Sequence, residues 1–291
     1  MNTPRSERRN FLRVALAGGS ALFAGCSPLG VVNGLVPNET YRRTTGLAYG
    51  PHARQALDVY QPTVASPAAP VIIFFYGGNW NAGNRGDYLF AGEALTSKGF
   101  TAVLPDYRLY PEVRFPDFLH DCAAAVRWTL ERIGELGGDA RRVFLMGHSA
   151  GAYNAAMLAL NPEYLRAAKV DPARVRGLIG LAGPYDFLPL TGSVSKGVFG
   201  FPDTPLNTQP IQFASAGDPP ALLITGDNDK VVDPGNSARL AARLRKNGVA
   251  VREMVYPDVS HVKLVGALAR PFRRIAPVLE DVAAFIADPA I

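Results

Sequence analysis

The sequence predicts an α/β fold with a mostly parallel central sheet, helices on both faces and a short cap insertion. Strand-like and helix-like segments alternate along most of the chain, which favours parallel strands joined by right-handed crossovers. Residues 71–76 form a continuous apolar run, typical of a strand buried on both faces. Residues 184–218 break the alternation with a Pro-, Gly- and Phe-rich segment that is too long for an ordinary connection. We expect this segment to be a cap over a site.

The composition favours one folded domain, which we place at residues 41–291. The chain has 291 residues, 48% of them hydrophobic and 19% charged, and it contains no internal repeat or long linker. The net charge is +5. Part of the basic excess, including Arg5, Arg8, Arg9 and Arg13, lies in a segment that we expect to be removed. No basic stripe with interleaved aromatic residues is present, so nucleic acid is not expected as a partner.

The first 25 residues resemble an export signal. Arg8 and Arg9 form a twin arginine before Phe-Leu, and the apolar stretch that follows is too short to span a bilayer. Glu7 departs from the usual twin-arginine pattern. The stretch ends at Cys26 in a sequence that resembles a bacterial lipobox, which implies a lipidated thiol, a tether over residues 26–40 and a protein anchored to the cell envelope. The alternative is a plain cleavage site with an incidental cysteine. Cys122 lies in a helical pattern and is expected to be a buried, inert thiol without a disulfide.

The individual elements follow from the apolar pattern and from the turn residues between them. Edge strands are expected at 44–49 and 56–60. The alternating strands are expected at 71–76, 101–104, 143–146, 175–181, 221–225 and 251–256. Helices are expected at 88–98, 118–133, 150–160 and 237–246, with one or two more from residue 261, broken at Pro271 and Pro277.

The segment Gly147-His148-Ser149-Ala150-Gly151 is the strongest functional signal in the chain. A predicted strand precedes it and an alanine-rich helix follows it, which is the context that a Gly-x-Ser-x-Gly nucleophile turn requires. The two glycines lack the Cβ atoms that would collide where strand and helix approach each other. Ser149 is therefore expected at the tip of a strained turn. The Ala150 amide, at the helix start, is expected to face a developing oxyanion.

A serine hydroxyl needs a base, and that base needs an acid to orient it. Of the four histidines, His261 is the best candidate, because it follows a strand whose carboxyl end lies at the same sheet edge as Ser149. His148 diverges from Ser149 within the turn, while the other two histidines lie in an early hairpin and in a helix. The acid is expected after the strand at 221–225, where Asp227, Asp229 and Asp233 are all candidates.

The loop Gly226-Asp227-Asn228-Asp229-Lys230-Val231-Val232 resembles the Gly-x-x-Asp-x-x-Val loop that carries the acid in the α/β-hydrolase superfamily. This resemblance favours Asp229, with Asp227 as the second choice. The chain order Ser149, Asp229, His261 is the order that this fold uses. The superfamily implies an α/β-hydrolase fold and a Ser-His-Asp triad.

The segment Tyr76-Gly77-Gly78-Asn79-Trp80 resembles the His-Gly-Gly-x-Trp oxyanion loop of an esterase and arylformamidase-like branch of that superfamily, related to the hormone-sensitive-lipase group. The resemblance covers roughly residues 55–284. It implies that the amides of Gly78 and Asn79 bind the oxyanion together with that of Ala150. Tyr76 stands where the branch has His, which implies altered support for the loop.

Together these features predict a serine hydrolase that cleaves carboxylic esters with small to medium acyl groups. Alternatives are an arylformamidase or amide hydrolase, a non-catalytic binding protein of the same fold and, less favoured, a peptidase. No metal-ligand cluster and no phosphate-binding glycine loop occurs, so neither a metal nor a cofactor is expected. Trp80 and Tyr153 are candidate walls of the substrate pocket.

For four further side chains we expect roles outside the reaction. Asp106 and Arg108 are expected to form a structural ion-pair site beneath the oxyanion loop. Arg85, like Lys230, is expected to be solvated.

Overall fold

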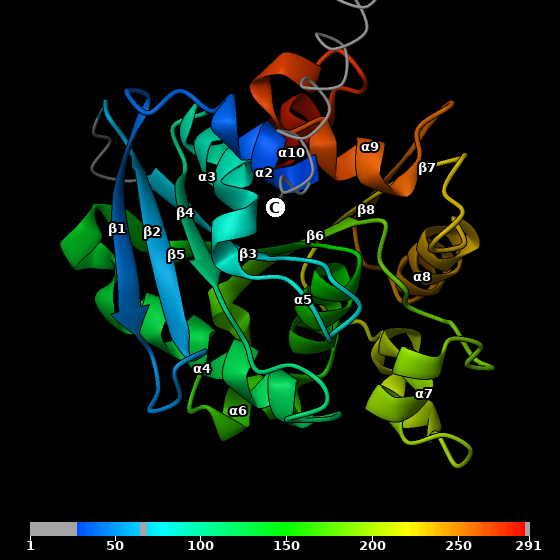
Figure 1. Cartoon of the computed structure of the whole chain (residues 1–291). Helices are drawn as coiled ribbons and strands as arrows, with labels where there is room; N and C mark the ends of the chain where they lie inside the picture. The colour runs from blue at the N-terminus through cyan, green and yellow to red at the C-terminus, as the bar shows by residue number, and fades with distance from the viewer. Residues whose placement is uncertain (1–27, 65–68, 289–291) are drawn as a thin grey trace, which may run out of the picture.

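The computed structural model describes residues 28–64 and 69–288, which form an eight-stranded sheet with helices on both faces (Figure 1). The strands are β1 (Tyr41–Ala48), β2 (Ala56–Pro62), β3 (Ala69–Phe75), β4 (Thr101–Pro105), β5 (Gly138–His148), β6 (Val175–Leu181), β7 (Ala221–Gly226) and β8 (Val251–Tyr256). Their order in the sheet is β1-β2-β4-β3-β5-β6-β7-β8. β1, β2 and β4 pair antiparallel, and every pairing from β4 to β8 is parallel. The predicted mostly parallel sheet is confirmed.

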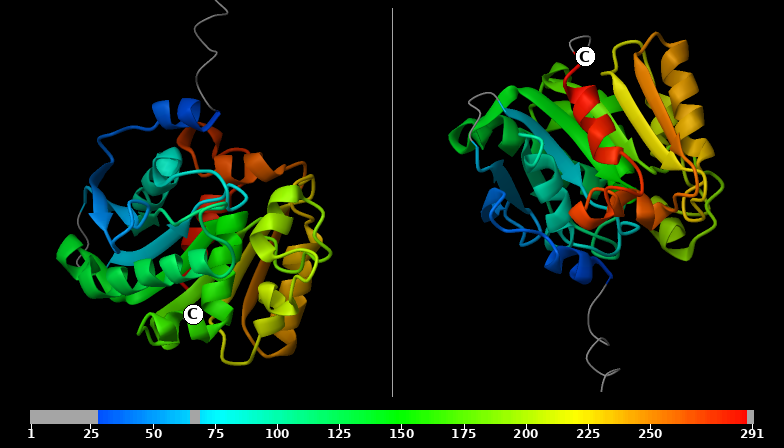
Figure 2. Two further views of the ribbon diagram at one scale, coloured as in Figure 1. Left: turned by 60° about the horizontal axis from the view of Figure 1, so that its bottom comes forward. Right: turned by 90° about the horizontal axis from the view of Figure 1, so that it is seen from above.

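The helices connect these strands. They are α2 (Pro28–Gly34), α3 (Leu89–Thr96), α4 (Asp117–Arg132), α5 (Ala150–Leu160), α6 (Pro162–Ala167), α7 (Ser193–Phe199), α8 (Gly235–Lys246), α9 (His261–Gly266) and α10 (Val278–Ile286). Short 3-10 turns are η1 (Arg85–Tyr88), η2 (Ile133–Leu136), η3 (Pro172–Arg174), η4 (Leu206–Thr208), η5 (Pro210–Phe213) and η6 (Arg270–Phe272). α3 and α10 cover one face of the sheet, while α4, α5 and α8 cover the other (Figure 2).

The central strands form the core because both of their faces are covered. Residues 71–75 of β3 are all buried, and so is every residue of β7. α5 is buried along its whole length and packs against β3, β5 and β6. Its alanines allow this close approach to the sheet. Cys122 of α4 is fully buried, as expected, and burial raises the pKa of its thiol.

The connection from β6 to β7 contains the predicted cap segment, 184–218. It folds into α7, η4 and η5, and its residues 184–195 lie against the pocket described below. It is coloured yellow-green in Figure 1, beside the carboxyl ends of the central strands. The sequence pattern therefore located an inserted segment correctly, while its action as a cap stays a prediction.

The start of the described chain differs from the expected tether. Residues 28–34 form α2. The Asn33 side chain donates to the Gly86 carbonyl at 2.8 Å and accepts from the Phe90 amide at 3.2 Å, which fixes α2 against η1 and α3. The expected signal at 1–25 and the expected lipidation at Cys26 lie outside the described residues. Within 28–64 and 69–288, no helix is both long and apolar enough to cross a bilayer.

Candidate active site

Ser149 lies in the strained turn between β5 and α5 that the sequence predicts. Its φ is 55° and its ψ is −123°, a conformation that L-residues rarely adopt. A Cβ on Gly151 would collide with the carbonyl oxygen of Phe75, and a Cβ on Gly147 would collide with the carbonyl oxygen of Gly151. Both glycines are therefore required by backbone contact. The predicted roles of Gly147 and Gly151 are confirmed.

His261 and Asp229 form a buried hydrogen-bonded pair at the same sheet edge. His261 Nδ1 lies 2.7 Å from Asp229 Oδ2. Asp229 Oδ1 accepts from the amides of Val231 and Val232 at 2.8 and 2.9 Å. Burial alone would raise the pKa of the Asp229 carboxyl, but the hydrogen bond from His261 and the two amides outweigh it, so the pKa is lowered. An ionised Asp229 fixes the tautomer of His261 that leaves Nε2 free to accept a proton.

The competing acids lie elsewhere. Asp227 accepts from the Asp258 amide at 2.8 Å at an exposed turn. Asp233 accepts from the Gly235 amide at 3.0 Å and pairs with Arg239. Of the three candidate acids, Asp229 is thus the one that the structure pairs with His261.

His148 links this pair to the turn that carries Ser149. Its Nε2 lies 3.2 Å from the His261 carbonyl oxygen, and the two imidazole rings are 4.6 Å apart between centroids. Burial, and secondarily the nearby His261, lower the pKa of His148 to about 3. The ring is therefore neutral near pH 7, and its Nε2–H donates to the carbonyl. His148 lies beside His261 as a structural neighbour, as expected for a histidine that diverges from Ser149.

The predicted oxyanion loop packs directly against Ser149. A Cβ placed on Gly77 would lie 3.0 Å from Ser149 Cβ. The three residues that follow, Gly78, Asn79 and Trp80, all have positive φ, at 137°, 51° and 59°. This backbone turns the loop sharply over the Ser149 turn.

The three amides proposed for the oxyanion are available at this point. Among the hydrogen bonds of the described residues, none has the amide of Gly78, Asn79 or Ala150 as its donor; Ala150 is the first residue of α5, whose amide has no partner within the helix. Such unpaired amides beside a nucleophile can bind a developing negative charge.

A pocket of about 580 Å³ opens beside Ser149. Its floor is formed by Asn79, Trp80, Ser149 and Ala150. Its walls come from the β6–β7 connection, from the loop that follows Asp229 and from the start of α8: Pro184, Asp186, Phe187, Leu188, Leu190, Thr191, Gly192, Ser195, Val231, Val232, Asp233, Asn236 and Arg239. A volume of this size is within the range of small-molecule sites.

The two predicted wall residues, Trp80 and Tyr153, occupy different positions relative to the pocket. Trp80 lines the pocket and donates from its indole N–H to Asn154 Oδ1 at 3.1 Å. Tyr153 is fully buried, donates to the Thr208 carbonyl at 2.7 Å and packs edge-on against Trp80 at 5.2 Å. Tyr153 supports the wall from behind instead of forming it.

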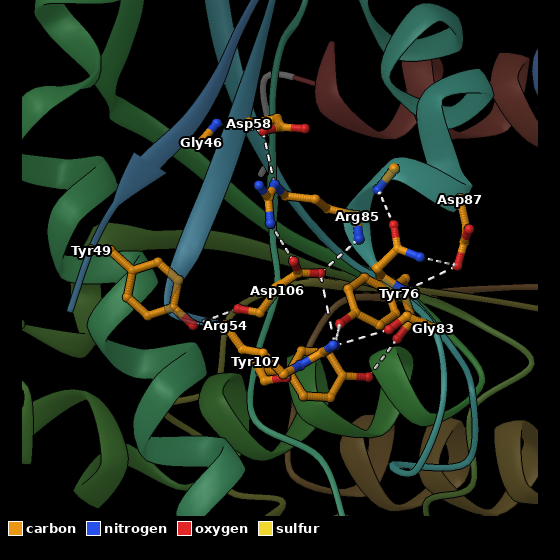
Figure 3. A network of polar contacts seen from close by, with 12 residues as sticks. Gly46, Tyr49, Arg54, Asp58, Tyr76, Gly83, Arg85, Asp87, Asp106 and Tyr107 are labelled. Atoms are coloured by element: carbon orange, nitrogen blue, oxygen red, sulfur yellow. Dashed lines mark hydrogen bonds and ion pairs between the residues drawn. The ribbon is translucent and has the colours of Figure 1, made fainter. Parts of the chain in front are cut away.

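The charged residues beneath the oxyanion loop pair differently from the expectation. Asp106 binds Arg85 and lies 3.9 Å from Arg54, while the Arg108 guanidinium forms two hydrogen bonds with Asp121, each at 2.8 Å. The expected Asp106–Arg108 site is therefore two separate sites. Arg85 was expected to be solvated, but its side chain is 23% exposed. It also binds Asp58 of β2, so its guanidinium lies between two carboxylates (Figure 3).

Arg54 lies between β1 and β2, in a turn whose sequence indicates no functional role. Its guanidinium donates to the Tyr76 hydroxyl and to the carbonyls of Gly83 and Tyr107 (Figure 3). The departure at Tyr76 was the one signal in the sequence that pointed to altered support at this place.

Comparison with known proteins identifies the family. The BD-FAE family model matches residues 57–244, which is more than half of the chain and spans β2 to α8. The chain belongs to the BD-FAE family. A prolyl oligopeptidase family model also matches residues 202–289. The BD-FAE match contains Ser149 and Asp229, and the second match contains Asp229 and His261.

Curated relatives of this BD-FAE member are esterases by name. It is 26% identical over 259 residues to the probable isoprenylcysteine alpha-carbonyl methylesterase ICMEL1 of Arabidopsis thaliana, an alignment that covers 81% of this chain and 54% of the relative. It is 27% identical over 233 residues to esterase LipC of Mycobacterium tuberculosis, covering 74% of this chain and 58% of LipC. The chain thus spans about half the length of the curated relatives it matches.

Solved structures confirm the α/β-hydrolase fold. Esterase B from Lactobacillus rhamnosis superimposes with a TM-score of 0.75 at 20% identity, over 95% of this chain and 94% of that one. A truncated carbohydrate esterase from gut microbiota gives a TM-score of 0.75 at 22% identity, over 86% of this chain and 97% of that one.

Proposed function

We propose that this BD-FAE member is a serine hydrolase that cleaves carboxylic esters with small to medium acyl groups. The observation that carries the proposal is the buried Asp229–His261 pair, with its 2.7 Å hydrogen bond, at the sheet edge where the strained turn presents Ser149. The free amides beside Ser149 and the esterase names of the relatives support the same reaction.

Each residue then has a defined step. Ser149 Oγ attacks the ester carbonyl carbon while His261 Nε2 takes the hydroxyl proton. The carbonyl oxygen becomes an oxyanion, to which the amides of Gly78, Asn79 and Ala150 donate. His261 returns its proton to the alcohol as the C–O bond breaks, which leaves an acyl-enzyme. Water, deprotonated by His261, attacks the acyl carbon and releases the acid. Asp229 stays ionised and stabilises the imidazolium.

The pocket supports the expected substrate size. Its volume of about 580 Å³ accommodates a small-molecule ester, and Trp80, Phe187, Leu188 and Leu190 provide apolar surface close to Ser149. A charged acyl chain would have to lose its hydration against these side chains, so uncharged acyl groups are favoured.

A series of p-nitrophenyl esters from acetate to decanoate tests the proposal. We expect turnover with an optimum at short to medium chains, and a fall of about a thousandfold or more in Ser149→Ala, because the nucleophile is removed. Gly134→Ala, a surface change with no atom near the added Cβ, serves as the control and keeps wild-type rates. Equal inertness of wild type and Ser149→Ala would reject the esterase and direct the assay to aryl formamides.

The cellular location is a separate proposal that rests on the sequence of residues 1–26. We propose that the protein is exported and held at the cell envelope by a lipid on Cys26. Metabolic labelling with an alkyne fatty acid in a bacterial host should mark the wild type and fail for Cys26→Ser, which should then leave the membrane fraction. The double variant Arg8→Lys, Arg9→Lys should stay in the cytoplasm if the protein is exported by the twin-arginine route. Equal labelling of wild type and Cys26→Ser would exclude lipidation at this cysteine.

A further inference from the structure

The oxyanion loop adopts a backbone that must be held by contacts outside itself. Asn79 and Trp80 have φ near +55° in succession, at 51° and 59°. A bulky residue such as Trp rarely takes this conformation, and each such residue costs about 1–2 kcal/mol. The loop's own hydrogen bonds, from the amides of Asn81 and Ala82 to the Gly78 carbonyl, close only the turn itself. They do not fix the turn to the rest of the molecule.

One guanidinium ties the two ends of this loop together. Arg54, which lies between β1 and β2, donates through Nη2 to the Tyr76 hydroxyl at 2.6 Å and to the Gly83 carbonyl at 2.9 Å. Its Nε donates to the Tyr107 carbonyl at 2.8 Å, and the Tyr107 hydroxyl donates to the Tyr76 carbonyl at 2.8 Å. Tyr76 directly follows β3, and Gly83 directly precedes Asn84, which caps η1, so the two residues mark the ends of the loop. Figure 3 shows Arg54 directed at both.

We propose that Arg54 and Tyr76 form a staple that holds the oxyanion loop in register with Ser149. Arg54 is then a positioning residue for the reaction. The inference rests on the proposed esterase function and adds to it the residue pair that compensates for Tyr in place of His at position 76. A planar guanidinium with several fixed donors can hold three acceptors in a set geometry, which a lysine ammonium does less well.

The charges around the staple support this arrangement. Asp106 lies 3.9 Å from Arg54 and also binds Arg85, which in turn binds Asp58. The guanidinium charge is therefore partly balanced beneath the loop. Burial, and then the charge of Asp106, raise the pKa of the Tyr76 hydroxyl, so it stays protonated and can accept from Arg54 through an oxygen lone pair.

The Tyr76 hydroxyl is used inside the staple and is not an oxyanion donor. The side chain is fully buried and stacks on Tyr107 at 4.8 Å and on Tyr88 at 5.7 Å. It is absent from the residues that line the pocket at Ser149. The ring anchors the loop through packing, and the hydroxyl anchors it through Arg54.

Steady-state kinetics of full-length Arg54→Ala test the proposal. Loop amides displaced by a fraction of an ångström stabilise the oxyanion less, so we expect kcat to fall about 100-fold with KM within about threefold of wild type. Added guanidinium at about 50 mM should occupy the vacated site and restore at least about tenfold of the lost kcat. A merely destabilised enzyme would not regain activity in this way.

Arg108→Ala is the matched control. Arg108 is as exposed as Arg54, at 27% against 29%, and also makes hydrogen bonds to a neighbouring segment, through Asp121. None of its hydrogen bonds within the described residues reaches the loop from 76 to 83. We expect Arg108→Ala to keep kcat within about twofold of wild type, and we expect added guanidinium to leave this kcat unchanged.

Tyr76→Phe decides the case if Arg54→Ala does not fold. It keeps both ring stacks and removes only the hydroxyl, so kcat should fall about fivefold to tenfold. A smaller loss for Arg54→Ala than for Tyr76→Phe would overturn the staple and assign the hydroxyl to the oxyanion. An Arg54→Ala or Tyr76→Phe variant with wild-type kcat would also overturn it, while a Ser149-dependent wild-type activity would keep the proposed function intact. A wild type that is inert toward esters would reject both.

Discussion

The Ser149 turn and the oxyanion loop meet at one point but are held in different ways. The turn is fixed by steric fit: Gly147 and Gly151 bring strand, turn and helix so close that no other residue fits. The loop from 76 to 83 is fixed by hydrogen bonds to distant segments: Arg54 holds its two ends, and its tip is held by the Tyr110 amide and by Asn154. A steric fit is broken by adding an atom, whereas a polar staple is broken by removing a donor or an acceptor. The two halves of the candidate site should therefore fail differently when they are changed.

The largest effect should come from Gly151→Ala. The added Cβ would overlap the Phe75 carbonyl oxygen, which belongs to a buried strand and cannot move aside. We expect a loss of about 3 kcal/mol or more in the free energy of unfolding, with no measurable ester turnover. Urea unfolding together with the p-nitrophenyl assay measures both. Gly134→Ala, whose Cβ would meet nothing within 4 Å, should change neither, and a stable, active Gly151→Ala would remove the steric half of the comparison.

Asp229→Asn tests whether Asp229 is the acid that supports His261 beside the Ser149 turn. Its carboxylate is held by two backbone amides and by His261, so the amide variant keeps much of the shape and loses the charge. We expect kcat to fall about a thousandfold or more, because the imidazolium is no longer stabilised. Asp227→Asn is the control and should stay within about threefold of wild type. Comparable losses in both variants would mean that Asp229 is not the acid.

His148→Gln tests the pH response of the same region. The His148 pKa is lowered from 6.5 to about 3 in the folded protein. Between these values the unfolded chain binds a proton that the folded chain does not, so the free energy of unfolding should decrease as the pH falls from 6.5 towards 3. Glutamine removes this titration, and its amide can still donate to the His261 carbonyl. Urea unfolding at pH 7, 5 and 4 measures this. As the pH falls, the free energy of unfolding should decrease more for the wild type than for His148→Gln, and an equal decrease in both proteins would contradict the prediction.

Asn79→Ala should give the smallest effect, because the oxyanion loop tolerates a change of side chain better than the Ser149 turn does. Asn tolerates a φ of 51° better than Ala, so the variant should lose about 1 kcal/mol, or about 2–4 °C in Tm. The backbone amide remains, and kcat should fall less than about tenfold. Asn79→Gly should recover the lost Tm. If Ala abolished activity as completely as Gly151→Ala, the loop would be as intolerant as the turn, and the contrast between them would be lost.

The same contrast explains how much the sequence predicted. The Ser149 turn, the parallel strands and His261 follow from local patterns, because the contacts that define each lie within a few residues or on an adjacent strand. The strand order placed the acid on the loop after β7, and the resemblance of that loop to the acid-bearing loop of the superfamily favoured Asp229 over Asp227 and Asp233. These elements agree with the fold as predicted, including the strand bounds of β6 and β8.

The polar support of the loop could not be predicted in this way. Arg54 lies 22 residues from Tyr76 and 29 from Gly83, and their contact depends on how β2, β3 and η1 come together. For the same reason Arg85 was expected in solvent, and Asp106 was expected to pair with Arg108. α2 was missed because its Pro, Gly and Asn content favours a loop, whereas the hydrogen bonds of Asn33 to η1 and α3 favour the helix.

Trp80 gives the candidate site an internal spectroscopic reporter. The chain has two tryptophans, and the other, Trp128, lies half-buried on α4. The Trp80 indole is 3% exposed, donates to Asn154 and forms part of the pocket at Ser149. A ligand that enters the pocket therefore displaces water from beside one of two fluorophores. In a Trp128→Phe background the emission wavelength would follow occupancy of the pocket directly, without a chromogenic substrate and even in a Ser149→Ala protein that turns nothing over.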